Sequence, residues 1–416
     1  MIFRFSLYGF LKNQKYYEPF LILAFLGKGL DFFYIGLLVG MREVVRALME
    51  MPSGALADVY GKKKCMLFSL SCYIISFLLF ALAESFPLFL GAMFIFGIGD
   101  AFRTGTHKAL IISWLEQNNR RDEQIKVYGF TRSWSQAGSA LSVLIGAGLV
   151  FYSGSYTDIF WFSIIPYAFN IVNLASYPAS LDSKKEVGLR KVASHLLHSG
   201  ARFIKQKKMR RLFFESMGFS GIYETAKEYL QPLLKLAALS LPFFLALGDV
   251  KRTAILVACV YTGLYLLSGC ASYFSHRITL FFGNQENAAR NLWRISFFAY
   301  LALFPALYFN LLPLAIAIFV FLALIQNIWR PVQVSRFNME APSDSVATVL
   351  SIESQSKSLA AMILAPLTGI VIDQLKVHGT GQGYEFWPVA VLGAVAGFIA
   401  IAFAKFATPP ESEREY

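Results

Sequence analysis

The sequence is poor in charged residues. Asp, Glu, Lys and Arg make up 15% of its 416 residues, whereas soluble proteins carry about a quarter. Hydrophobic residues make up 56%, and a hydrocarbon core about 30 Å thick needs roughly 20 apolar residues per helix. This composition excludes an ordinary soluble protein and predicts an all-α integral membrane protein of about twelve transmembrane helices.

The sequence also lacks the patterns that mark enzymes, pumps and metal sites. It has only 4 Cys, with no CxxC and no His at a zinc-like spacing. A Walker loop is absent, which excludes a self-contained ATP-driven pump. No nucleophile–base pair stands out either. We therefore predict that the chain is not an enzyme and holds no metal or cofactor.

Acidic residues are outnumbered by basic ones, which gives a net charge of +12. The basic residues gather between the apolar stretches, above all in 184–211, and such segments mark the cytoplasmic side of a membrane. Because no recognition fold accompanies the charge, we expect no binding of nucleic acid. Apolar residues at helical spacing among these charges predict a helix on the inner membrane surface, and a disordered tether is the alternative.

Twelve apolar stretches predict the spans, and they divide into two sets of six. The predicted spans are 5–26, 33–56, 65–83, 86–112, 127–151, 159–179, 212–238, 253–275, 292–309, 311–332, 344–373 and 386–406. Six spans, a basic linker and six more spans are typical of transporters built from two parallel repeats. The predicted domains are a six-helix bundle at 1–180, a partly helical linker at 181–211, a second bundle at 212–407 and a tail at 408–416.

The linker also predicts the orientation of the chain. With the linker inside, both termini and the basic loop at 61–64 are cytoplasmic. We expect a monomer in the plasma (inner) membrane of a bacterium, surrounded by lipid. Cysteine labels at Lys63, Lys205 and Arg414 should react only from the cytoplasm, and a label at Gly379 only from outside. Reversed reactivity at Lys205 and Gly379 would contradict this topology.

Charge inside the predicted spans follows a pattern. The third, sixth, ninth and twelfth spans contain no Asp, Glu, Lys or Arg within 65–83, 159–179, 295–309 and 386–404. Most of the other spans contain several. Charged side chains inside a bilayer are costly and usually face an interior. We therefore expect the four charge-free helices to face lipid and the others to surround a polar interior.

The second and fourth spans carry the charges that are most informative. Arg46 and Glu50 are i,i+4 neighbours in the second span, and Asp100 and Arg103 share a face in the fourth. Such pairs either orient packed helices or bind solute and protons. We predict the second role for most of them. The candidate residues of the substrate or proton pathway are Glu18, Arg46, Glu50, Asp100, Arg103, Arg132, Glu215, Glu224 and Glu353.

A loop motif follows the second span. It reads Gly54-Ala-Leu-Ala-Asp58-Val-Tyr-Gly61-Lys62-Lys63-Lys64, in which the helix should end at Gly61 and Gly54 should allow close helix packing. The motif resembles the signature loop of the major facilitator superfamily, G-x-x-x-D-x-x-G-R/K-R/K, at every defined position. The resemblance implies a two-bundle fold, a central cavity and alternating access.

The resemblance also suggests a gate and a function. Asp58 would cap the start of the eleventh span, with Lys62 or Lys63 available to Asp344. Met93 stands where drug antiporters of the family carry Arg. This departure argues against the prediction that the chain is a drug–proton antiporter. We predict a secondary active transporter of a small organic solute, with proton-coupled export (efflux). The alternatives are an uptake or facilitative carrier, and a transporter-like receptor or assembly partner.

Overall fold

A computed structural model describes residues 1–103, 106–120, 123–178, 181, 206–340, 346–378 and 383–406 of the chain. These residues form helices and no strands. Most of the predicted linker and the tail at 408–416 lie outside the described residues, as do Asp344 and Gly379. The side chain of Asp58 is outside them too.

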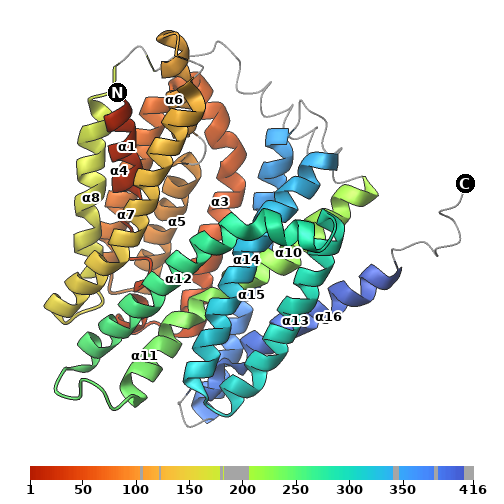
Figure 1. The fold of residues 1–416 in the computed structure, drawn as a ribbon. Helices are drawn as coiled ribbons and strands as arrows, with labels where there is room; N and C mark the ends of the chain where they lie inside the picture. Colours follow the sequence, from red (N-terminus) through yellow and green to blue (C-terminus); the bar gives the residue numbers. More distant parts are fainter. Residues whose placement is uncertain are drawn as a thin grey trace, which may run out of the picture. The chain divides into compact units, whose positions relative to one another are not determined.

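The helices fall into two compact units (Figure 1). One unit comprises Met1–Ser199 and Ala238–Tyr265, and the other comprises Gly200–Ala237 and Leu266–Tyr416. The first eight helices are α1 (Ile2–Lys12), α2 (Leu21–Gly27), α3 (Phe32–Tyr60), α4 (Lys62–Leu82), α5 (Phe86–Arg103), α6 (Thr106–Gln117), α7 (Gln124–Ser153) and α8 (Ile159–Ala175). The others are α10 (Lys207–Ala226), η3 (Lys227–Tyr229), α11 (Leu230–Ser240), α12 (Asp249–Phe281), α13 (Gln285–Tyr308), α14 (Leu312–Glu340), α15 (Val346–His378), η4 (Tyr384–Phe386) and α16 (Trp387–Phe406).

Helices occupy all twelve predicted spans, although several boundaries differ. By length and apolar composition, seven helical stretches of the described chain qualify as membrane spans, and α8 is a shorter apolar helix. Helix α3 is not among the seven, since its middle carries four charged residues. The number of spans therefore stays a prediction, whereas the all-helical character of the chain is confirmed.

The first predicted span is not one continuous helix. It divides into α1 and α2, separated by residues 13–20. Polar side chains at the break bind the backbone of α7: the Asn13 amide donates to the Ser135 carbonyl at 3.1 Å, and the Gln14 amide to the Gly138 carbonyl at 3.1 Å. A Cβ at Gly138 would lie 2.6 Å from the Phe10 carbonyl oxygen, so a glycine is needed at this crossing.

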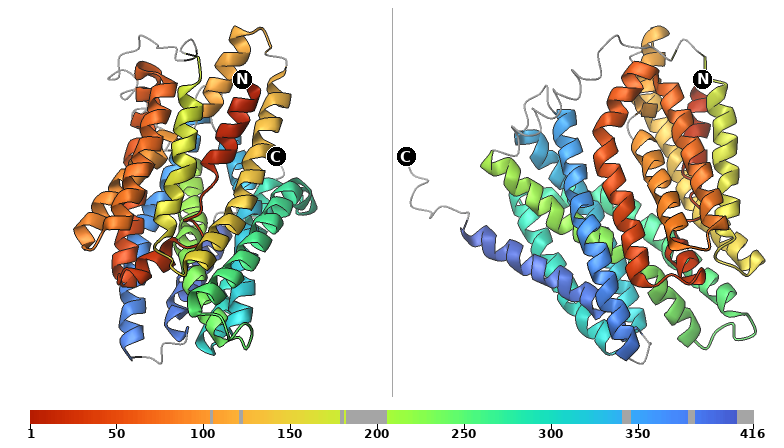
Figure 2. Two further views of the ribbon diagram at one scale, coloured as in Figure 1. Left: turned by 90° about the vertical axis from the view of Figure 1, so that its left-hand side faces the viewer. Right: turned by 180° about the vertical axis from the view of Figure 1, so that it is seen from behind.

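Helices α3, α4 and α5 pack closely in the first unit (Figure 2). A Cβ at Gly97 of α5 would lie 2.8 Å from the Val45 Cβ of α3. Hydroxyl groups add to the contact, because Ser53 donates to the Ala101 carbonyl at 3.0 Å and Ser69 to the Gly99 carbonyl at 2.6 Å. These contacts fix the depth and rotation of the fourth predicted span against its neighbours.

Substitution by alanine at two glycines of α5 should have different effects on the stability of the protein. Gly97→Ala is expected to destabilise the protein by about 1–3 kcal/mol, since the new methyl group overlaps Val45. Gly91→Ala is the control: nothing lies within 4 Å of its Cβ, so the change should be neutral or stabilise the helix by up to about 1 kcal/mol. Thermal unfolding of both purified variants checks this, and equal shifts would contradict the close packing at Gly97.

The charge-free helices show one buried and one exposed face. In α4, Phe68, Ile75 and Leu82 recur every seven residues and are 47–61% exposed, whereas Tyr73 is fully buried. Phe169 of α8 and Phe398 of α16 are 63% and 64% exposed. Within each unit these helices therefore present an apolar surface suited to lipid, but their other faces pack inward.

The second unit is held by equally close helix pairs. A Cβ at Gly221 of α10 would lie 2.3 Å from the Ala360 Cβ of α15. At the pair of α13 and α16, a Cβ at Gly393 would lie 2.3 Å from the ring of Tyr300. Because glycine has no side chain, the backbone of α10 can lie close to α15, and the backbone of α16 can lie close to α13.

Candidate functional site

A buried ion pair lies at the end of α5. The Arg103 guanidinium contacts the Asp100 carboxylate at 3.0 Å, and the Tyr73 hydroxyl of α4 donates to the same carboxylate oxygen. The guanidinium also lies over the Tyr73 ring, 5.3 Å from its centroid. The side chains of Asp100 and Arg103 are 16% and 20% exposed, so the pair is mostly buried and keeps some access to solvent. We call Tyr73, Asp100 and Arg103 the acidic cluster.

Aromatic rings and further cations surround the acidic cluster. Tyr73 contacts Tyr167 of α8, with ring centroids 4.9 Å apart. The positive charges of Arg46 and Lys15 also act on the Asp100 carboxylate. Tyr73 and Tyr167 are both fully buried, so their rings shield the ion pair from solvent.

A second charged group lies on α3. Glu43 is 1% exposed and accepts from two arginines: Arg42 Nε at 3.1 Å and Arg46 Nη2 at 2.6 Å. Together with Glu50 on the same helix, these residues place two positive and two negative charges in the middle of α3, so the charges balance. Glu50 lies further along α3, where its backbone carbonyl accepts from the Ser53 hydroxyl at 3.0 Å.

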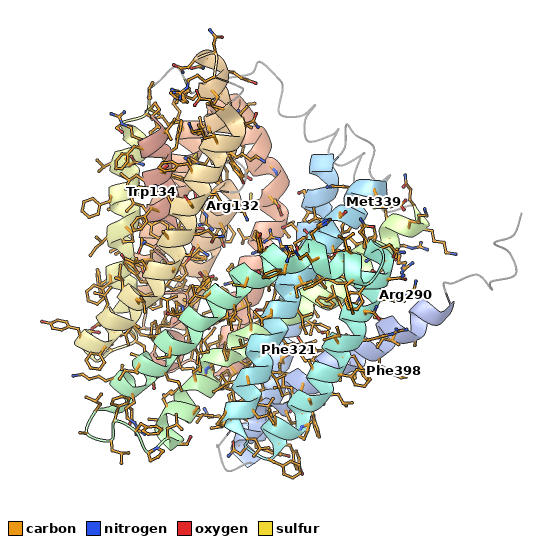
Figure 3. All side chains as sticks on the ribbon, in the orientation of Figure 1. Arg132, Trp134, Arg290, Phe321, Met339 and Phe398 are labelled. Carbon is orange, nitrogen blue, oxygen red and sulfur yellow. The ribbon has the colours of Figure 1, made fainter. Side chains whose placement is uncertain are left out.

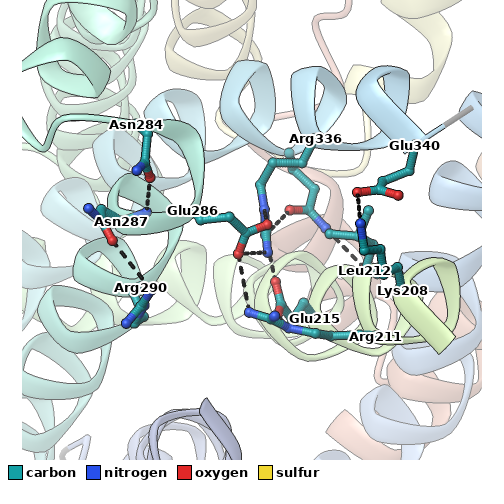
Figure 4. A network of polar contacts seen from close by, with 11 residues as sticks. Lys208, Arg211, Leu212, Glu215, Asn284, Glu286, Asn287, Arg290, Arg336 and Glu340 are labelled. Atoms are coloured by element: carbon teal, nitrogen blue, oxygen red, sulfur yellow. Dashed lines mark hydrogen bonds and ion pairs between the residues drawn. The ribbon is translucent and has the colours of Figure 1, made fainter. Parts of the chain in front are cut away.

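The second unit contains a larger ion-pair network (Figure 4). Arg336 of α14 is 2% exposed and binds both oxygens of Glu286 of α13, at 2.9 and 3.0 Å. Its other nitrogen binds Glu215 of α10 at 2.5 Å and the Gln333 side chain at 2.8 Å. Arg211 bridges the same two carboxylates at 2.7 and 3.2 Å. The network thus ties three helices together at one end of the unit.

Glu286 should make the stability of this network depend on pH. Burial raises the pKa of its carboxyl, but the hydrogen bond from Arg336 and nearby guanidiniums outweigh burial and hold the pKa below the ordinary 4.5. The stabilisation is therefore full above pH 4.5 and decreases as the pH falls from there through the lower folded-state pKa. In thermal unfolding, Glu286→Gln should lose less stability on acidification than the unaltered protein; parallel curves would contradict this role.

The family follows from comparison with known proteins. The model of the Major Facilitator Superfamily matches residues 13–283, which is most of the chain. The chain belongs to the major facilitator superfamily. It is accordingly a membrane transporter of the major facilitator type, and this membership favours a non-enzymatic role.

Similar proteins agree with this membership. The uncharacterized MFS-type transporter YxaM of Bacillus subtilis (strain 168) is 22% identical over 366 residues, covering 85% of this chain and 84% of that protein. The crystal structure of the nucleoside transporter NupG matches with a TM-score of 0.75 at 14% identity, over 98% and 99% of the two chains. A POT family transporter bound to 5-aminolevulinic acid matches with a TM-score of 0.68 at 15% identity, over 98% and 96%. At these identities the structures show the fold alone.

Of the other predicted pathway residues, Glu18 and Arg132 belong to the first unit, and Glu224 and Glu353 belong to the second. Glu18 pairs with Lys15 at 3.1 Å and accepts from the Tyr265 hydroxyl at 3.3 Å. Arg132 is exposed on α7 (Figure 3). In the second unit Glu224 pairs with Lys227, and Glu353 is 7% exposed and accepts from the Ser216 hydroxyl at 3.3 Å.

The signature loop of this facilitator ends α3 as predicted. Gly61 has φ of 106°, a conformation that favours glycine, and α4 begins at Lys62. Lys63 donates to the carbonyls of Ala175 and Tyr177 at 2.8 and 2.5 Å, and so caps the end of α8. The close approach predicted at Gly54 is not seen: no described atom lies within 4 Å of its Cβ position. The predicted latch to Asp344 lies outside the described residues.

Several residues of these clusters were not predicted from the sequence, among them Tyr73, Arg336 and Glu286. Tyr73 lies on a charge-free helix, so a search for charge passes over it. Arg336 and Glu286 lie 50 positions apart in different helices, so no sequence spacing links them. In the described part of the facilitator, no group of three His, Cys, Asp or Glu side chains could hold a metal ion.

Proposed function

We propose that this facilitator exports a small organic solute in exchange for protons, by alternating access, and that Asp100 carries the proton. One observation supports this most strongly: Asp100 is a shielded carboxylate that contacts Arg103 and Tyr73 while retaining 16% exposure. Arg is effectively never deprotonated, so a proton in this cluster must reside on Asp100. Intramembrane carboxylates of this kind commonly serve as proton carriers.

Exchange requires that solute and proton compete for one group. A solute with an ammonium group can pair with Asp100 by displacing the Arg103 guanidinium, which covers the fully buried Tyr73 ring at 5.3 Å. Such a solute would displace a proton from the carboxyl, which links export to proton entry. We therefore propose a cationic or zwitterionic organic solute with an apolar or aromatic body.

The same cluster would bind a different kind of solute if the protein worked by uptake. A solute with a carboxylate or phosphate group would instead pair with Arg103, and a proton would then neutralise Asp100. In that case solute and proton bind together and move in the same direction. The choice between export and uptake therefore depends on which partner of the ion pair the solute takes.

A binding screen can test the proposal. The purified protein would be unfolded thermally in the presence of nucleosides, 5-aminolevulinic acid and organic amines. The nucleoside transporter NupG and the POT family transporter bound to 5-aminolevulinic acid share its fold. A bound solute stabilises the folded state by about 2.7 kcal/mol at 100 times its Kd. We expect an amine-bearing compound to stabilise, and to do so less at low pH.

Two variants then distinguish export in exchange for protons from uptake together with protons. Asp100→Asn should abolish this stabilisation, whereas Arg103→Gln should retain it. The reverse result with an anionic compound would overturn export in favour of uptake. A compound that binds without crossing the membrane of proteoliposomes would instead support the receptor alternative.

A further inference from the structure

The second unit contains an apolar cleft that is independent of the acidic cluster. The cleft lies between α10, α13, α15 and α16 and has a volume of about 670 Å³. Its walls include Phe214, Gly218, Trp293, Ile363 and Ile399. Phe214, Ile363 and Ile399 are 48–60% exposed, so the cleft opens at the side of the unit.

One end of the cleft is strongly basic. A smaller cavity of about 110 Å³ adjoins it and shares Arg211, Glu215 and Trp293 with it. This cavity is also lined by Arg290, Arg294, Arg336 and Glu286, which makes four arginines against two glutamates. The side chains at this end therefore carry a surplus of two positive charges.

Two of the four arginines are available to a ligand. Arg336 and Arg211 already bind the two carboxylates. The hydrogen bonds of Arg290 and Arg294 go to the neutral side chains of Asn287 and Asn291, at 3.3 and 3.2 Å. A guanidinium prefers a carboxylate or phosphate, which it binds with two parallel hydrogen bonds. The surplus charge is thus concentrated on Arg290 (Figure 3) and Arg294.

We propose that this cleft binds one anionic phospholipid, with its phosphate on Arg290 and Arg294 and an acyl chain along the apolar walls. The volume lies within the range of about 300–1,000 Å³ that is usual for ligand sites. Basic pockets between transmembrane helices are suited to anionic headgroups. A zwitterionic headgroup fits less well because its ammonium group would face the surplus positive charge. The side opening admits a lipid directly from the bilayer.

The test measures lipid binding to the purified full chain in an uncharged detergent. Native mass spectrometry and thermal unfolding would be recorded with phosphatidylglycerol, phosphatidylcholine and glycerol 3-phosphate. We expect one retained phosphatidylglycerol and a clear rise in the unfolding midpoint with this lipid only. Equal effects of phosphatidylcholine would show that charge is not recognised, and equal effects of glycerol 3-phosphate would show a free-anion site; either result overturns the proposal.

Two kinds of variant test the two parts of the site. The double variant Arg290→Gln/Arg294→Gln should weaken phosphatidylglycerol binding at least about tenfold, and Arg277→Gln, an exposed arginine outside the cavity, should not. Ala396→Phe should fill the cleft and also weaken binding, whereas Val395→Phe, on the exposed side of the same helix, should not. Unchanged binding in both test variants would overturn the proposal.

Discussion

Asp100→Asn is expected to reduce solute-driven proton movement in proteoliposomes to the rate of empty liposomes. The change removes the only group of the acidic cluster that can release and regain a proton in the proposed cycle, because Arg103 stays charged and Tyr73 serves as donor to the carboxylate. A pH-sensitive dye inside the liposomes measures the flux, with the best-binding amine from the screen as the solute. Glu84→Gln, a change of an exposed carboxyl in the same unit, is the comparison and should retain most of the flux.

Loss of folding must be separated from loss of coupling in this experiment. Asn at position 100 leaves the Arg103 charge without its carboxylate, which typically costs about 3–5 kcal/mol for a buried pair. The double variant Asp100→Asn/Arg103→Gln removes both charges and should recover stability without recovering proton flux. If Asp100→Asn keeps full pH-dependent transport at equal protein level, the ion pair only orients helices and the proton site lies elsewhere.

Arg336→Gln is expected to destabilise the second unit by about 3 kcal/mol, since it removes the buried guanidinium and leaves Glu215 and Glu286 to the more exposed Arg211 alone. Thermal unfolding of the purified protein would show this as a large fall in the midpoint. Arg330→Gln is the matched control: Arg330 lies on the same helix but is exposed, so its change should stay within about 0.5 kcal/mol.

A triple variant tests whether the cost comes from the two carboxylates that have lost Arg336. Arg336→Gln/Glu215→Gln/Glu286→Gln removes the charges together, and such neutral replacements of buried ion pairs are often tolerated. It should therefore be more stable than Arg336→Gln alone. If the single variant unfolds at the same temperature as the unaltered protein, the network does not hold the three helices together.

The sequence predicts the helices well because the relevant signal is local. Stretches of apolar residues predict the helices. A glycine predicts the end of α3 at Gly61, where the backbone has a positive φ that favours glycine. The polar contacts are harder to predict because helical spacing leaves several partners within reach. Arg46 can reach Glu43 and Glu50 equally well, and the structure pairs it with the buried Glu43 at 2.6 Å.

Contacts between different helices cannot be predicted from the local sequence. Asp100 and Arg103 are predictable as neighbours on one face, whereas the Tyr73 hydroxyl reaches them only because α4 and α5 pack at Gly99. Glu215 binds Arg336 and Arg211 in a network that ties helices together, and its role in the pathway stays a prediction. Charge alone therefore identifies candidates, and packing decides which of them share a site.

The break in the first span bears on how the chain enters the membrane. Helix α1 has 11 residues, which is about 16 Å of helix against a hydrocarbon core of about 30 Å. Its continuation through residues 13–20 is not helical, and lipid cannot hydrogen-bond backbone groups. Asn13 and Gln14 bind the backbone of α7 more than 120 residues later. The first span cannot reach its final state when it leaves the ribosome. Its contacts with α7 can form only after α7 has been synthesised.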